Sequence, residues 1–276
     1  MKNSPCYIIA EIGINHNGSL EQALQLIAVA KEAGCNAVKF QKRTIEAVYT
    51  SDELAKPRES VFGLTNGDLK RGLEFGYSEY SAIDSYCKSL DIDWFASCWD
   101  KEAVDFIAQF SPPFYKIASA LLTDDSLLMH TWAQNTSIIL STGMSTIEQI
   151  DHAVEVLGKK NLTLLHCMSA YPAYNDELNL LVIPKLYSRY MLPIGYSGHE
   201  LGTVTTVAAA AIGACMIERH ITLSRDLWGS DQAASLEPEE LKELVRDIRF
   251  VEAALGDGIK RVYEREIPIM QKLRRK

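Results

Sequence analysis

The stretch CYIIAEIGINHNGSLEQALQLIAVAKEAGCNAVKFQ, residues 6–41, shows the pattern on which the chain is built. It opens with a short, almost uniformly apolar run (6–13), continues with apolar side chains at helical spacing (20–34), and returns to a second apolar run (37–41). Apolar runs of this length are typical of parallel strands that are covered on both faces. Gly34 is expected to end the helix. The stretch therefore predicts a strand, a helix and a second strand.

The same alternation continues to the end of the chain. The helical stretches that follow cover 78–90, 100–110, 145–158 and 238–255, and Ser145 with Glu148 has the spacing of a capping box. The further strand-like runs are WFASC (94–98), FYKIAS (114–119), IILST (138–142), LTLLHC (162–167), PIGYS (193–197) and MIERH (216–220).

Eight such units in one chain predict a (β/α)₈ TIM barrel that occupies residues 1–276 as a single domain. A doubly wound open sheet is the alternative, but the turn after the first run, GINHNG, lacks the GxGxxG pattern of that fold. Residues 43–77 are too long for a simple loop after the second strand, and we expect a lid over the barrel mouth. Residues 258–276 are expected to form a short C-terminal extension outside the barrel.

Composition narrows the class of protein. The chain has 276 residues, of which 47% are hydrophobic and 23% charged, and its net charge of −8 argues against a nucleic-acid-binding protein. No apolar run reaches the length of a membrane span or a signal segment, so no membrane partner is expected. No two of the six cysteines have CxxC spacing, which fits neither a zinc knuckle nor a redox pair. Scattered thiols indicate a reducing cytoplasm.

Polar side chains stand near the carboxyl end of nearly every predicted strand, where TIM barrels carry their active sites. This regularity predicts a common site. The residues are Glu11, Lys39, Gln41, Ser97, Lys116, Ser119, Ser141, Thr142, His166, Ser197, His199, Glu218 and His220.

Lys39 and Lys116 lie in runs that should be buried on both faces. A buried ammonium group requires an anionic partner. One interpretation is a structural ion pair with Glu11 or Glu218, and the other is a binding site for phosphate or carboxylate groups of a substrate. Serine hydroxyls on neighbouring strands would contribute to the second.

His199 and His220 end the last two predicted strands, which are neighbours in a barrel. Two imidazoles at this position suit Mn²⁺, Fe²⁺ or Zn²⁺. Asp231 follows the last strand and is a candidate substrate contact. The remaining candidates are assigned other roles: His166 to packing or support of the site, His16, His130 and His152 to loop or helix surfaces, and Cys98 and Cys167 to packing.

The motifs IAEIGINHNGS, AVKFQ, YKIAS, ILSTGM, LLHC…YP, IGYSGHE and ERHITL…D…SLEPEEL, in this order, resemble the sialic acid synthase family. The resemblance covers essentially the whole chain. It implies a transferase that condenses phosphoenolpyruvate with an aldehyde sugar such as N-acetylmannosamine, to give a 2-keto-3-deoxy sugar acid and phosphate.

The resemblance also implies roles for individual residues. His199 and His220 would hold the divalent metal, with Mn²⁺ expected and Mg²⁺ as the alternative. Glu11, Lys39, Lys116, His199 and His220 would form the catalytic group. The substrate contacts would be Ser97, Ser119, Ser141 and Ser197 toward phosphoenolpyruvate, with Gln41, Tyr171 and Asp231 toward the metal and the sugar.

Three positions depart from the family pattern: Leu121 replaces an acidic residue, Ser169 an asparagine, and Trp99 a phenylalanine. They put the identity of the acceptor sugar in question. Family members also continue into an antifreeze-like domain. Here that domain is expected to be dispensable, to be supplied by a separate partner, or to be missing because the chain is a fragment, and a homodimer is expected. Two other hypotheses are a non-catalytic regulatory binder of phosphoenolpyruvate or sugar, and another barrel enzyme, either an epimerase or an aldolase that uses Lys116 as a Schiff-base nucleophile.

Overall fold

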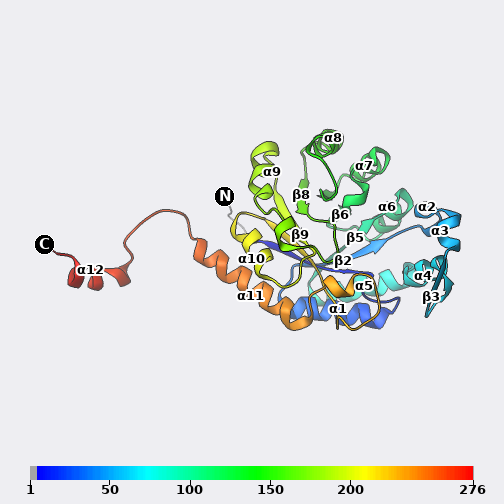
Figure 1. Ribbon diagram of the computed structural model, residues 1–276, viewed down its shortest axis with the longest axis horizontal. Helices are drawn as coiled ribbons and strands as arrows, with labels where there is room; N and C mark the ends of the chain where they lie inside the picture. The colour runs from blue at the N-terminus through cyan, green and yellow to red at the C-terminus, as the bar shows by residue number, and fades with distance from the viewer. Residues whose placement is uncertain (1–4, 276) are drawn as a thin grey trace.

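The computed structural model describes residues 5–275. Eight parallel strands close into a barrel in the order β1-β10-β9-β8-β7-β6-β5-β2, with helices outside it (Figure 1). The predicted TIM barrel is therefore confirmed, and the open sheet is excluded. The barrel strands are β1 (Tyr7–Gly13), β2 (Ala37–Lys42), β5 (Asp93–Cys98), β6 (Phe114–Ile117), β7 (Ser137–Ser141), β8 (Leu162–Cys167), β9 (Ile194–Gly198) and β10 (Met216–His220).

The first outer helix begins and ends on recognisable caps. Ser19 caps the first helix, and Gly34, with φ of 88°, ends it as predicted. The outer helices are α1 (Leu20–Ala33), α5 (Tyr77–Leu90), α6 (Lys101–Ala108), α7 (Asp125–Trp132), α8 (Ile147–Leu157), α9 (Val182–Tyr190), α10 (Val204–Ala211) and α11 (Pro238–Leu255).

The capping box at the start of α8 was predicted one residue too early. Thr146 caps the helix and exchanges hydrogen bonds with Gln149, in place of Ser145 with Glu148. The Ser145 hydroxyl is used elsewhere, because it donates to the Gly143 carbonyl oxygen at 3.1 Å.

The side chains inside the barrel form layers, because every second residue of a strand points inward. An apolar layer fills the lower interior and consists of Ile9, Ala37, Phe95, Ile139, Leu165 and Met216. Two residues further along each of these strands, the inward positions become Glu11, Lys39, Ser97, Ser141, Cys167 and Glu218. The barrel interior is therefore filled by apolar side chains toward the N-terminal ends of the strands and is polar at its C-terminal rim.

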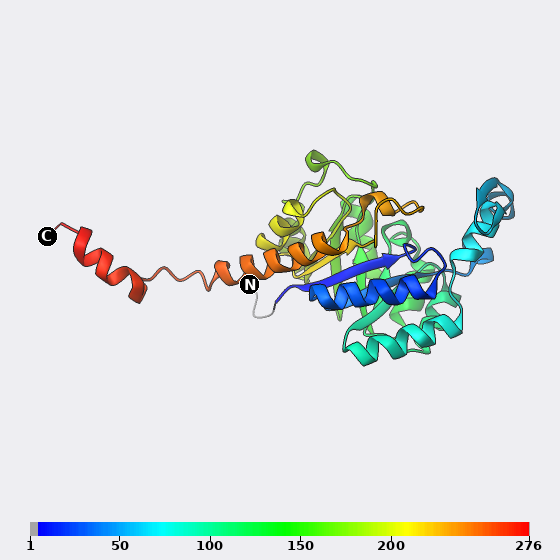
Figure 2. The ribbon, with the colours of Figure 1, turned by 90° about the horizontal axis from the view of Figure 1, so that it is seen from below.

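The insertion after β2 folds as a small unit beside the rim. It contains α2 (Ile45–Val48), α3 (Ser51–Ala55), α4 (Asn66–Leu73) and an antiparallel pair, β3 (Pro57–Ser60) and β4 (Gly63–Thr65). Figure 2 shows it projecting sideways from the barrel. None of residues 43–77 lines the cavity at the barrel mouth. The insertion does not cover this cavity, and a lid over the barrel mouth stays a prediction.

The C-terminal extension leaves the barrel after α11. A 3₁₀ turn, η4 (Glu264–Glu266), and the short helix α12 (Ile267–Leu273) lie away from the barrel in both views (Figures 1 and 2). Over the described part of the chain, no helix combines the length and apolar character needed to cross a membrane.

Candidate active site

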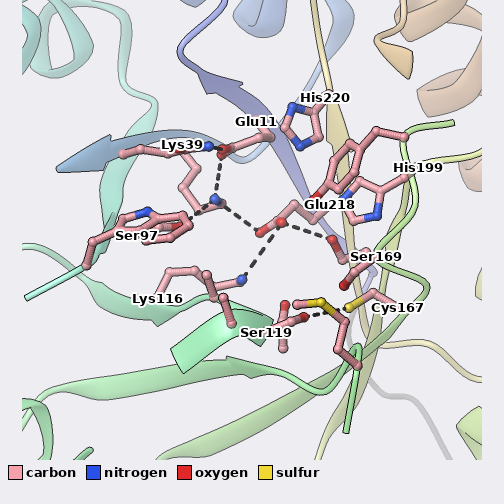
Figure 3. Close-up of a pocket in the computed structure, with 18 residues that line it drawn as sticks. Glu11, Lys39, Ser97, Lys116, Ser119, Cys167, Ser169, His199, Glu218 and His220 are labelled. Carbon is pink, nitrogen blue, oxygen red and sulfur yellow. Dashed lines mark hydrogen bonds and ion pairs between the residues drawn. The ribbon is translucent and has the colours of Figure 1, made fainter. Parts of the chain in front are cut away.

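The register of the first strands brings a carboxylate and an ammonium group together at the C-terminal rim of the barrel. β1 pairs with β2 so that Glu11 stands opposite Lys39, and β2 pairs with β5 so that Ser97 follows on the next strand. The Lys39 Nζ lies 2.6 Å from Glu11 Oε2 and donates to Ser97 Oγ at 2.7 Å (Figure 3). Lys39 and Glu11 are almost fully buried, so both contacts are shielded from solvent.

Lys116 enters the same space from β6. Its Nζ lies 4.0 Å from Glu218 Oε1 on β10 (Figure 3). The same atom lies 3.4 Å from the Ile117 carbonyl oxygen. Glu218 also receives a hydrogen bond from Ser197 Oγ at 3.0 Å and lies 3.8 Å from Lys39 Nζ. Glu218 thus stands between the two ammonium groups.

The two interpretations of the lysines are therefore compatible. Lys39 forms a close buried ion pair with Glu11, as the structural interpretation required. Lys116 is held only loosely by Glu218 and faces the cavity, as a binding site for anions requires.

The site shifts the pKa values of Glu11 and Glu218 in opposite directions. Burial raises the pKa of Glu11 to about 7, against the pull of Lys39 and with help from Glu218. Burial also opposes ionisation of Glu218, but Lys116 and Lys39 prevail and lower its pKa to about 2. Glu218 is therefore a permanent anion, whereas Glu11 can exchange a proton near neutral pH.

His199 and His220 meet at the ends of β9 and β10, with ring centroids 5.4 Å apart. Burial first, and then His220, lowers the pKa of His199 to about 4, and burial lowers the pKa of His220. His199 Nδ1 is 2.7 Å from the Met168 carbonyl oxygen, which can only accept, so this nitrogen carries the proton. Both rings are thus neutral at pH 7 and the His199 Nε2 lone pair is available.

This donor set fits a divalent ion in part. Neutral imidazole with Nδ1–H bound to a carbonyl is the usual form of a metal-ligating histidine. The Nδ1 of His220 is buried without a hydrogen bond and lies 3.8 Å from Asp231 Oδ2. Within residues 5–275, however, no three His, Cys, Asp or Glu residues converge as ligands. An ion here would need oxygen ligands from substrate or water.

The opposite wall of the site is formed by hydroxyl and thiol groups. Ser119 Oγ lies 3.1 Å from Cys167 Sγ and accepts a hydrogen bond from the Gly143 N–H at 3.0 Å. A Cβ at Gly143 would lie 2.2 Å from Ser169 Oγ, so this wall leaves room only for glycine. The assignment of Cys167 to packing is wrong, because its thiol lines the cavity, whereas Cys98 lies in the outer core as expected.

These side chains surround a cavity of about 250 Å³. Glu218 was expected at the rim but was given no catalytic or binding role, and Cys167 was assigned to packing, although the two-residue period of their strands places both on the inward face. Asp231 does not line the cavity and reaches it only through His220. The predicted residues that the structure brings together are Glu11, Lys39, Gln41, Ser97, Lys116, Ser119, Ser141, Tyr171, Ser197, His199 and His220.

The three departures from the family pattern have different positions. Trp99 and Ser169 line the cavity. Leu121 does not line it and packs against the outer core instead, while Ala120 faces the site. Both residues belong to the 3₁₀ turn η1 (Ser119–Leu121).

Behind the two histidines lies a buried ion pair that the sequence did not reveal. Arg219, 1% exposed, lies 3.4 Å from Glu200 Oε1 and donates to Thr206 Oγ1 at 2.6 Å and to the Glu200 carbonyl at 2.6 Å. Tyr196 donates to the other Glu200 oxygen at 2.9 Å. Because Arg219 and Glu200 adjoin His220 and His199 in sequence, this network fixes both strand ends.

The other histidines do not line the cavity. His166 contacts the Leu178 carbonyl oxygen at 2.7 Å, as expected for a supporting residue. His130 and His152 lie on helices, each beside an aspartate. His16 is in a loop as predicted, but it is buried against Phe75, with ring centroids 4.0 Å apart, and is not a surface residue.

Comparisons with known proteins agree with this geometry. A sequence profile described as the NeuB family matches residues 26–260. The chain is 39% identical over 274 residues to N-acetylneuraminate-9-phosphate synthase of Mus musculus, covering 98% of this chain and 76% of that protein. It is 35% identical over 285 residues to N,N'-diacetyllegionaminic acid synthase of Legionella pneumophila, covering 98% and 79%.

A solved structure shares the fold at full length. The crystal structure of N-acetylneuraminic acid synthetase from Leptospira borgpetersenii, in complex with citrate, superposes with a TM-score of 0.87 at 33% identity. The match covers 99% of this chain and 94% of that one.

Proposed function

The chain belongs to the NeuB family, and we propose that it joins phosphoenolpyruvate to an open-chain aldehyde sugar, releasing phosphate and a 2-keto-3-deoxy sugar acid. The observation that carries this proposal is the pair of buried ammonium groups, Lys39 and Lys116, facing one cavity beside two neutral histidines. Phosphoenolpyruvate carries a phosphate and a carboxylate, and two cations with serine donors match both.

The chain's own residues suit the steps of this reaction. Lys39 and Lys116 would hold the two anionic groups so that the enol carbon faces the aldehyde. The enol carbon bonds to the aldehyde carbon, whose oxygen takes up a proton. Water then adds to the phosphate-bearing carbon and loses a proton, and the C–O bond to phosphate breaks.

Glu11 is the proposed proton carrier. A general acid or base works best with a pKa near the working pH, and the pKa of Glu11 is raised to about 7. Glu218 stays ionised and would orient Lys116 and Ser197, which it contacts.

We further propose that His199 and His220 hold a divalent ion, with Mn²⁺ expected. Such an ion would polarise the aldehyde oxygen as a Lewis acid. Removal of the ion with a chelator should abolish turnover, and addition of Mn²⁺ should restore it. Retained activity after exhaustive chelation would contradict the metal assignment.

The acceptor is proposed to be an N-acetylated sugar or its phosphate, since both named relatives carry acetylated sugar acids in their names. The test measures inorganic phosphate and 2-keto acid with phosphoenolpyruvate, Mn²⁺ and a panel of aldehyde sugars. We expect inorganic phosphate and 2-keto acid to form in equal amounts. Both should form only when an N-acetylated acceptor sugar is present. Absence of phosphate release with every acceptor would overturn the proposal.

One observation favours a second candidate, a Schiff-base aldolase. Burial, with Lys39 opposing ionisation, lowers the pKa of Lys116, which makes its amine more nucleophilic. Borohydride reduction in the presence of substrate distinguishes the two, because only the aldolase leaves a covalent adduct on Lys116.

Cellular location and assembly stay predictions. A cytoplasmic enzyme fits the supply of phosphoenolpyruvate that this reaction needs. A homodimer, or a separate antifreeze-like partner at the barrel mouth, can be tested by sedimentation of the purified chain.

A further inference from the structure

One arginine outside the active-site cavity contacts two of the residues that line it. Arg43 directly follows β2, and its side chain is mostly buried although it does not line the cavity. Its guanidinium donates a hydrogen bond to Gln41 Oε1, and its Cζ lies 4.3 Å from the centre of the Trp99 ring. Gln41 and Trp99 both line the cavity. Arg43 therefore supports two parts of the cavity wall from behind.

The hydrogen bond from Arg43 fixes the direction in which the Gln41 amide faces. A guanidinium has only donors, so it must meet the amide oxygen. The amide nitrogen then faces Glu11 and donates to its Oε1 at 3.0 Å. Arg43 keeps this orientation even when Glu11 takes up a proton, because a guanidinium never accepts. The second N–H of the Gln41 amide is thus available to an oxygen of a ligand in the cavity.

The cation–π contact with Arg43 orients the Trp99 ring. Trp99 follows β5, and its backbone N–H donates to the Lys42 carbonyl oxygen at 3.0 Å, which fixes its backbone beside that of Arg43. The indole N–H is buried and has no hydrogen-bond partner within residues 5–275. The guanidinium over the ring is therefore the polar contact that determines where the indole lies.

Arg43 is itself held by a buried carboxylate at the end of the insertion. Glu74 follows α4, accepts a hydrogen bond from the Arg43 backbone N–H at 3.2 Å, and lies 3.5 Å from Arg43 Nη1. Lys42 Nζ lies 3.2 Å from Glu74 Oε2. Glu74 thus keeps a cation when the Arg43 side chain is replaced, so we expect variants at position 43 to fold.

We propose that Arg43 is a positioning residue for the acceptor sugar, acting through Gln41 and Trp99. The inference rests on the proposed function, in which Lys39 and Lys116 hold the anionic groups of phosphoenolpyruvate. Gln41 and Trp99 carry no charge, and they offer an amide and an aromatic surface, which suit the hydroxyl groups and the C–H bonds of a sugar. Arg43 would then contribute to recognition of the sugar although it does not line the cavity.

The test measures KM for phosphoenolpyruvate and for N-acetylmannosamine, or for the neutral sugar of the panel that reacts fastest, with Mn²⁺ present. Arg43→Met should raise the KM of the sugar about 10-fold and that of phosphoenolpyruvate by less than about two-fold, since a hydrogen bond and a cation–π contact to the sugar-binding residues are lost. Arg43→Lys should give an intermediate KM for the sugar, because one ammonium group cannot both bond to Gln41 and cover the Trp99 ring.

Two further variants separate positioning from a general effect of charge. Arg71→Met is the matched control, since Arg71 is an exposed arginine of the insertion that pairs with Glu46, and it should change neither KM. In a Gln41→Met background, Arg43→Met should raise the KM of the sugar by only about three-fold, because one of the two contacts is already absent. An equal factor in both backgrounds would overturn the inference. So would a rise in the KM of phosphoenolpyruvate that Arg43→Lys reverses.

A failure of the proposed function gives a different result, in which no acceptor at all releases phosphate. In that case, or if no neutral sugar reacts, crystal structures of the wild type and of Arg43→Met are compared. We expect the Gln41 amide or the Trp99 indole to move by about 1 Å or more in the variant, a displacement large enough to matter for binding. Unchanged positions of both side chains would show that Arg43 does not position them.

Discussion

Lys116 is a buried ammonium group with little to hold it in place. Its nearest carboxylate oxygen is 4.0 Å away, which is long for an ion pair between groups that are almost fully buried. Desolvation of such a group opposes folding unless close partners compensate. The structure therefore retains at this position a charge that contributes little to stability, as expected where a charge serves ligand binding.

We predict that Lys116→Met separates activity from stability. Turnover should fall by roughly 10²- to 10³-fold, since a charge aimed at the reacting anion is lost. The free energy of unfolding in urea should change by less than about 1–2 kcal/mol, because the desolvation cost of Lys116 is removed while Glu218 loses one of its two cations and keeps Lys39. Lys101→Met, on the exposed start of α6, should change neither quantity. Loss of stability with full activity would contradict a binding role for Lys116.

His16 is predicted to make stability depend on pH. Burial lowers its pKa to about 3, and its Nδ1 accepts a hydrogen bond from the Gly18 N–H, which protonation would break. The folded state thus favours neutral imidazole. The resulting stability is fully present above the unfolded pKa of about 6.5 and is lost as the pH falls toward 3.

The measurement is urea unfolding at pH 7 and pH 5. The wild type should lose about 2 kcal/mol more than His16→Gln between these values, because only the unfolded wild type gains this proton. Equal losses in both proteins would show that His16 is not held neutral by the fold.

At the scale of elements, a buried ion pair joins the C-terminal ends of the neighbouring strands β9 and β10. Arg219 is on the outer face of β10, and Glu200 follows β9, so the pair joins the two strands that carry the histidines. Its hydrogen bonds to Thr206 and to the Gly202 carbonyl oxygen, at 2.6 and 2.8 Å, tie the same strand ends to the segment that begins α10.

Removal of one partner should be far more harmful than removal of both. Arg219→Met leaves Glu200 buried without its cation and should lower the free energy of unfolding by about 3–5 kcal/mol. The Arg219→Met/Glu200→Gln double variant should recover part of that loss. Arg189→Met, which breaks an exposed pair with Asp151, is the control and should have little effect. Unfolding of Arg219→Met at the wild-type urea concentration would refute this prediction.

For the whole molecule, the barrel is expected to be independent of the C-terminal extension. Most residues of 258–275 are exposed, and both ribbon views place α12 away from the barrel (Figures 1 and 2). Truncation after Asp257 should therefore change the free energy of unfolding by less than about 0.5 kcal/mol.

A shorter chain provides the contrast. Truncation after Leu244 also removes Val245 and Ile248, which α11 buries against the barrel. It should lower stability by roughly 3–6 kcal/mol, at about 1.5–3 kcal/mol for each buried side chain. Equal unfolding curves for the two truncated chains would contradict the packing seen here.

The sequence by itself determined the eight strands, the barrel and most of the residues that line the candidate active site. Apolar runs of strand length and amphipathic stretches between them are local patterns, and burial on both faces follows from them directly. Because side chains alternate along a strand, Glu11, Lys39 and Ser97 could be placed on one rim before any distance was known. The same period places Glu218 on this rim, and it also indicates Cys167, which was assigned to packing.

Only the tertiary structure decided which of these groups interact. The ion pair of Lys39 with Glu11, the loose hold on Lys116 and the buried Arg219–Glu200 pair depend on the register in which distant strands close the barrel. Ala120 lines the cavity where Leu121 was expected to face the acceptor, and the insertion lies beside the rim and does not line the cavity. Such contacts join residues far apart in the chain, so no local pattern records them.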